Sequence, residues 1–202
     1  MNGAAKNPII LSESWRHDVE TDELIDLRAN PSERHPTSSY CAKVRVYESR
    51  VREWFLNIAQ DSVHQGESPA DYLALSISLA YIEGIEQYRQ GQSTPNGKSR
   101  KWFMESAIRI FPAASPEALQ RLWNDCRCGL FHSGFTDGRT YVSHGYEQPL
   151  AIVGGELEVN PRLIVEAVCE DFSRYIDLLK HRTDTALCAN FEKLWDYRWE
   201  NS

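Results

Sequence analysis

The sequence has no apolar run that approaches the roughly 18–20 residues needed to cross a bilayer. Residues 1–8 also lack the apolar core of a signal peptide. These absences argue against membrane-spanning and exported proteins. We therefore expect a cytoplasmic protein with no membrane partner.

Cysteines are few and follow no framework. There are five, an odd number, and they are scattered along the chain, which favours reduced thiols over disulfides. Cys126 and Cys128 form a C-x-C pair, but no second pair stands at zinc-site spacing. On a helix the two sulfurs would point roughly 200° apart, at about 100° per residue. We expect no metal site.

Two further features are missing. The sequence contains neither a Walker loop nor a dinucleotide-binding glycine motif, so we expect no cofactor. Positive charge is also scarce, with 22 Lys and Arg against 29 Asp and Glu and a net charge of −7. Broad, non-specific binding of nucleic acid needs an excess of basic residues along one face. Any RNA would have to be bound in a confined pocket.

What the chain does have is helical periodicity. Apolar residues recur at steps of three and four, and capping residues, prolines and glycines mark the ends of each periodic segment. This pattern predicts a mainly α bundle of five or six helices over residues 40–202. The predicted helices cover residues 40–63, 69–90, 98–111, 116–133, 161–181 and 184–199.

Two segments fall outside this pattern. Residues 1–39 are polar and rich in turn signals, and only residues 21–28 look helical, with Thr21 as a cap. We interpret residues 1–39 as an N-terminal arm that wraps the helical domain or a partner. Residues 139–159 read as short strands around a Gly154-Gly155 turn, which predicts a small antiparallel sheet or hairpin.

The second predicted helix carries an unusual carboxylate. Residues 72–82 contain no charge, which is typical of a central, buried helix, and Glu83 follows directly. A carboxylate at the end of a buried run is costly unless it is paired. We expect an arginine on a neighbouring helix to be its partner.

The fourth helix closes with Arg127 and, five residues later, His132. A guanidinium matches phosphate oxygens, and an imidazole titrates near neutrality and can move protons. In a regular helix the two side chains would lie about 140° apart in projection and about 7.5 Å apart along the axis. They could meet one ligand only because arginine is long and the helix ends at Gly134. Asn124 lies about one turn before Arg127 and could face the same ligand.

The segment from Leu122 to Gly134 resembles the signature helix of HEPN domains, whose shared motif is Arg-x(4–6)-His. The resemblance extends over residues 40–179 through the order of the predicted elements and the glutamate after the buried helix. It implies a HEPN-like helical domain over residues 40–202. One difference is that Cys128 follows the arginine, where many active members carry Asn, Asp or His. Another is Gly134, where nuclease toxins of the family often carry Tyr.

The resemblance implies a metal-independent endoribonuclease, a toxin or defence component. His132 would be the general base or acid, Arg127 would stabilise the phosphorane, Glu83 would orient Arg127 or His132, and Asn124 would contact substrate. It also implies a homodimer with facing signature helices, and it allows a cognate antitoxin as a partner. Two alternatives stay open: a non-catalytic module that binds nucleotide or RNA, and a structural or interaction protein in which Arg127, Glu83 and His132 only hold the bundle together. Cys128 favours these alternatives.

Overall fold

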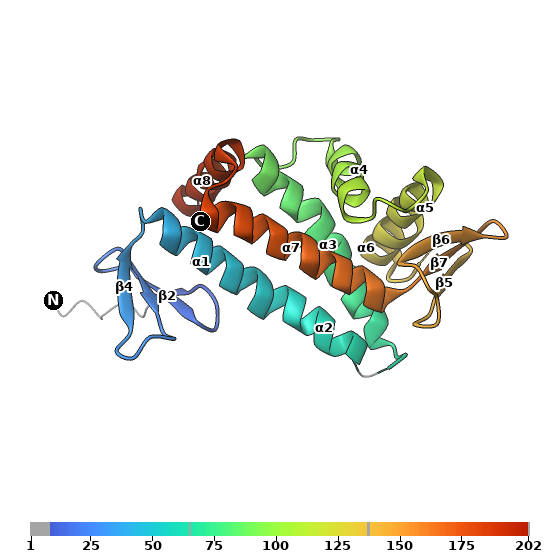
Figure 1. Cartoon of the computed structure of the whole chain (residues 1–202), viewed down its shortest axis with the longest axis horizontal. Helices are drawn as coiled ribbons and strands as arrows, with labels where there is room; N and C mark the ends of the chain where they lie inside the picture. The colour runs from blue at the N-terminus through green and yellow to red at the C-terminus, as the bar shows by residue number, and fades with distance from the viewer. Residues whose placement is uncertain (1–8, 65, 137, 202) are drawn as a thin grey trace.

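The computed structural model describes residues 9–64, 66–136 and 138–201, and within them the chain forms six helical rods flanked by two small sheets (Figure 1). The rods are, in chain order, α1 (Tyr40–Val51) continued by η1 (Arg52–Leu56) and α2 (Asn57–His64), α3 (Ala70–Gln90), α4 (Ser99–Ile110), α5 (Pro116–Arg121) continued by η2 (Leu122–Cys128) and α6 (Gly129–Ser133), α7 (Pro161–His181), and α8 (Thr185–Glu200). The prediction of a mainly helical fold is confirmed.

α3 is the central helix and packs against α2, α4, α7 and α8. Leu75, Leu79 and Ile82 on this helix are fully buried, in agreement with the charge-free run of the sequence. The burial is less complete than expected, because Tyr72 and Leu73 are 42% and 51% exposed. α3 therefore keeps one open apolar face near its N-terminal end.

Two of the rods contain a π-helical segment, which the sequence pattern did not predict. η1 interrupts the first rod, and η2 interrupts the fourth rod (residues 116–133), which we call the signature rod. A π-helical turn is wider than an α-helical one, and such turns are often found at functional sites. Because η2 includes Arg127, side-chain directions estimated for a regular α-helix do not hold at this residue.

The ends of the signature rod follow its sequence signals. The Ser115 hydroxyl accepts a hydrogen bond from the Ala118 amide, and Pro116 occupies the first turn. Gly134 ends the rod with a φ of 77°, a left-handed conformation that glycine adopts without steric cost. His132 consequently lies in the last turn, as predicted.

The C-terminal sheet contains β5 (Thr140–Val142), β6 (Leu150–Val153) and β7 (Glu156–Val159). β6 and β7 form the expected antiparallel hairpin across Gly154 and Gly155, whose φ values are both positive. β5 differs from the expectation, because it pairs with the other edge of β7 in parallel. β5 is joined to β6 by a long loop, residues 143–149, and not by a tight turn.

The predicted helix over residues 21–28 is wrong. Residues 9–36 form an antiparallel four-stranded sheet in the order β1-β2-β3-β4. The strands are β1 (Ile9–Ile10), β2 (Trp15–Asp18), β3 (Glu23–Asp26) and β4 (Glu33–Pro36). Burial alternates along β3, with Leu24 and Asp26 buried, so period-two burial overrides the local helical signal. Residues 1–8 of the expected arm lie outside the described residues.

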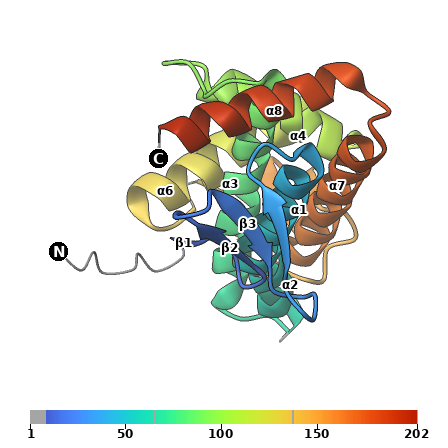
Figure 2. The same cartoon turned by 90° about the vertical axis from the view of Figure 1, so that its left-hand side faces the viewer.

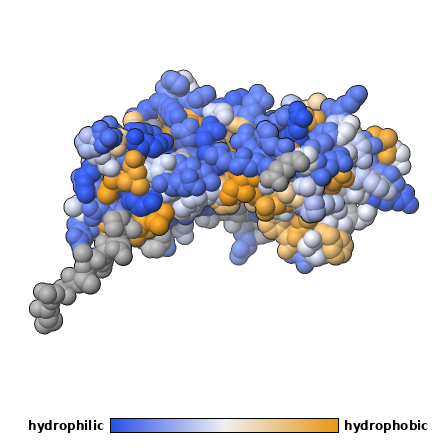
Figure 3. Space-filling view, turned by 90° about the horizontal axis from the view of Figure 1, so that it is seen from below, coloured by the Kyte–Doolittle hydropathy of each residue, from blue (hydrophilic) through white to orange (hydrophobic). Residues whose placement is uncertain are grey.

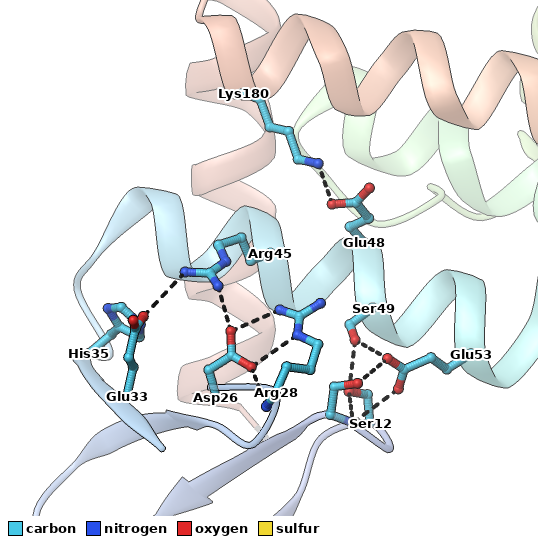
Figure 4. Close-up of polar contacts among 11 residues, drawn as sticks. Ser12, Asp26, Arg28, Glu33, His35, Arg45, Glu48, Ser49, Glu53 and Lys180 are labelled. Atoms are coloured by element: carbon cyan, nitrogen blue, oxygen red, sulfur yellow. Dashed lines mark hydrogen bonds and ion pairs between the residues drawn. The ribbon is translucent and has the colours of Figure 1, made fainter. Parts of the chain in front are cut away.

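This N-terminal sheet covers one end of the bundle, close to α1 (Figure 2). Figure 4 shows the polar contacts that hold it there. The buried Asp26 carboxylate accepts hydrogen bonds from Arg28 at 3.0 Å and from Arg45 of α1 at 2.5 Å. Next to it, Glu53 accepts hydrogen bonds from Ser14 and Ser49. The sheet is therefore fixed to the first rod by charged as well as apolar contacts.

Candidate functional site

The sequence-predicted pair of Glu83 and Arg127 is present in the structure. Glu83 lies on α3 and Arg127 on η2, and the arginine donates to a single glutamate oxygen, Oε2, from Nε at 3.2 Å and from Nη2 at 2.8 Å. Their side chains are 16% and 20% exposed, respectively. The pair thus links two helices while one edge of it reaches solvent.

Two aromatic rings flank the guanidinium. The Arg127 Cζ atom lies 4.9 Å from the centre of the Trp123 ring and 5.1 Å from that of Phe131. Cation–π contacts of this kind orient a guanidinium and contribute roughly 0.5–1 kcal/mol each at exposed sites. Trp123 is largely buried, whereas Phe131 is half exposed. The sequence analysis missed both rings, although their spacing of four residues on either side of Arg127 was the available signal.

Among the described residues, His132 and Asn124 are not bonded to this pair. Both are exposed, and within the described residues the structure gives neither side chain a hydrogen bond or an ion pair. His132 lies in the last turn of α6, one turn beyond Arg127 along the same rod. The structure therefore brings together two of the four predicted site residues and leaves the other two at the surface of the signature rod.

The two cysteines of the C-x-C pair differ in burial. Cys126 is fully buried and Cys128 only partly so. Burial, with the charge of Asp125, raises the pKa of the Cys126 thiol to about 12. Such a thiol stays protonated and is a poor metal ligand. In the described parts of the chain, no three His, Cys, Asp or Glu side chains are grouped so as to hold a metal ion.

A second charged cluster, which the sequence analysis did not identify, lies inside the bundle. Arg109 of α4 bonds Glu86 of α3 at 3.0 Å and Asp171 of α7 at 3.1 Å, and both carboxylates are almost fully buried. Burial alone would raise the pKa of Glu86, but hydrogen bonds from Gln90, Arg109 and Ser106 outweigh it and lower that pKa. Because its partners satisfy it so fully, we interpret this cluster as a cross-link of three helices.

A third polar contact joins the C-terminal sheet region to the bundle. The His144 ring nitrogen Nε2 lies 2.9 Å from Asp71, which also accepts from the Ser68 amide at the start of α3. Asp71 lies in the first turn of α3. The His144–Asp71 contact positions the loop after β5, so we do not include it in the candidate site.

Comparison with protein-family models, with curated proteins and with solved structures finds no match to this chain. No helix among the described residues is both long and apolar enough to span a membrane.

Proposed function

We propose that the chain is a HEPN-type, metal-independent endoribonuclease whose active groups are Arg127 and His132. The proposal is supported mainly by how the Arg127 guanidinium is held and by the donor that it leaves free. Glu83 and two rings hold its guanidinium at a solvent-exposed edge, and Nη1 makes no hydrogen bond within the described residues. A preorganised guanidinium with free donors is suited to a phosphate group.

The chemistry needs no metal or cofactor. The ribose 2′-oxygen attacks phosphorus, forming a cyclic phosphate while the bond to the 5′-oxygen breaks. His132 takes the 2′-hydroxyl proton or supplies one to the leaving 5′-oxygen. Arg127 stabilises the charge on the phosphorane oxygens, and Glu83 fixes its orientation. His132 is suited to this role because its ring is exposed and makes no hydrogen bond within the described residues.

We propose that the active form is a homodimer in which two signature rods face each other. Phe131 and Phe135 are 49% and 62% exposed on either side of His132, and Leu73 of α3 is 51% exposed. Contiguous exposed apolar surface often marks an interface, and Phe131 and Phe135 would supply such surface on the signature rod. In such a dimer the two His132 side chains can serve as the base and the acid of one reaction.

The test is incubation of the purified protein with single-stranded RNA in excess EDTA, followed by analysis of the fragment ends. We expect 5′-hydroxyl ends and cyclic phosphate ends. His132→Ala should remove the cleavage, and His181→Ala, which changes an exposed histidine on α7, should retain it. Intact RNA with the wild-type protein, across sequences and structures, would contradict the proposal.

A second candidate function is RNA binding without cleavage. It is favoured by the contact of two Arg127 nitrogens, Nε and Nη2, with Glu83, because the carboxylate neutralises the guanidinium and competes with phosphate. Under this alternative, labelled RNA should bind in a filter assay and remain intact. Glu83→Gln should then tighten the binding, since it removes the competing charge.

A further inference from the structure

A groove of about 710 Å³ lies between the β1 region and the helices. Its walls come from the β1 region, from α1 and η1, from α3, and from the C-terminal end of α8. This volume is within the roughly 300–1,000 Å³ range of pockets that hold small molecules. Figure 3 shows separate apolar patches on the face of the molecule that is seen from below Figure 1.

The walls of the groove are mostly apolar and aromatic. Ile9, Ile10 and Phe55 are about half exposed along it, and Trp195 and Trp199 stack on each other at its α8 end. The α3 wall combines two small residues, Ala80 and Gly84, with Tyr81, Ile85 and Tyr88. A methyl group added at Gly84 would meet no atom within 4 Å, so this part of the groove is open.

Among the described residues, the charged side chains that line the groove are two arginines, Arg50 and Arg198. Arg50 lies 5.0 Å from the centre of the Trp54 ring, and Arg198 donates to the neutral Tyr88 hydroxyl and Gln87 side chain. Neither arginine has a carboxylate partner within the described residues. In a chain with a net charge of −7, this groove is a local site of uncompensated positive charge.

We propose that the groove binds a free amphipathic anion, a small molecule with an apolar chain or ring system and one carboxylate or phosphate group. The apolar body would lie against α3 and the tryptophans of α8, and the anion would meet Arg50 or Arg198. Apolar walls with a few placed polar groups are the usual composition of a small-molecule site. This site is independent of the proposed cleavage of RNA, because neither Arg127 nor His132 lines the groove.

The test uses dodecanoate as the probe, below its micelle concentration, with dodecanol and dodecyltrimethylammonium as matched controls. Binding is measured by calorimetry and by fluorescence of the tryptophans at the wall. We expect dodecanoate to bind most tightly and the cation least tightly. The double variant Arg50→Gln with Arg198→Gln should lower the affinity for dodecanoate by about tenfold or more, which is the effect expected from a lost hydrogen bond to a charged group. The same double variant should leave the affinity for dodecanol unchanged.

Two further variants separate the groove from the rest of the surface. Gly84→Leu places a side chain into the groove and has the higher helix propensity, so it should fold and lose dodecanoate binding. Ala80→Leu is the second filling variant, in case the first fails to fold. Arg162→Gln, at an exposed pair on α7, is the control and should bind as the wild type does.

Three results would overturn the proposal. The first is equal affinity for the three probes, which would indicate unselective apolar binding. The second is binding to anionic phospholipid vesicles with none to free dodecanoate, which would make the groove a membrane contact. The third is a wild type that binds no probe while Gly84→Leu changes its oligomeric state, which would make the groove a contact between copies.

Discussion

At the scale of single residues, the proposed function requires the Arg127 guanidinium to bind both the Glu83 carboxylate and a phosphate group. Glu83 is only 16% exposed and needs a cation, whereas a phosphate would need the same guanidinium. The geometry serves both, because Nε and Nη2 bind one oxygen of Glu83 and leave Nη1 free of hydrogen bonds within the described residues. The two flanking rings keep the guanidinium plane in place while a ligand approaches.

This arrangement gives a prediction for stability. Arg127→Ala removes the partner of a carboxylate that is largely shielded from water, and we expect a loss of about 1–3 kcal/mol in the free energy of unfolding. Arg162→Ala on α7, which breaks an exposed pair, should change it by no more than about 0.5 kcal/mol. Urea unfolding of the wild type and the two variants measures both changes. Equal losses of unfolding free energy in the two variants would show that the Arg127–Glu83 pair stabilises the fold no more than an exposed pair does.

The sequence could predict part of this site. An uncharged run that ends on Glu83 required a cationic partner, and Arg127 on the signature rod was the expected one. The rings around Arg127 were not predicted, because the π-helical turn of η2 changes the side-chain directions that a regular helix would give. Sequence spacing also could not decide whether His132 meets Arg127, since this depends on how the last turn ends.

On the scale of elements, the helices were predictable and the N-terminal sheet was not. Each helix carries an apolar period and its own caps, as at Ser115 and Gly134. The strands β2, β3 and β4 are four residues each and contain many charged residues. The alternation of apolar and polar residues that indicates a strand therefore cannot be recognised in the sequence. Their pairing and their contacts with α1, which are not local, determine the fold of this segment.

The attachment of the N-terminal sheet should depend on pH through Asp26. Burial alone would raise the pKa of this carboxyl, but hydrogen bonds and charges from Arg28 and Arg45 outweigh it and lower that pKa below the usual 3.8. A lowered pKa in the folded state stabilises the protein above pH 3.8, and this stabilisation is lost as the pH falls from there through the folded value.

We therefore expect the melting temperature of the wild type to fall more steeply than that of Asp26→Asn as the pH is lowered from 5 to 2, while Asp26→Asn is the less stable protein at pH 7. Asp61→Asn, at an exposed position, is the control and should follow the wild type. Parallel curves for Asp26→Asn and the wild type would contradict this assignment.

For the whole molecule, the exposed apolar side chains around the signature rod predict self-association. We expect a dimer in analytical ultracentrifugation at tens of micromolar concentration. Phe135→Glu should give a monomer with an unchanged melting profile, since the wild-type ring is 62% exposed and contributes little to the core. A wild type that is strictly monomeric at this concentration would exclude the proposed dimer.

In the proposed function, His132 and Arg127 act on RNA. This function can be tested by measuring RNA cleavage and the melting temperature together for His132→Ala. The proposed function predicts that cleavage in EDTA is lost while the melting temperature stays within about 1 °C of the wild type, because an exposed side chain without hydrogen bonds within the described residues contributes little to stability. Cleavage that persists in His132→Ala would contradict the claim.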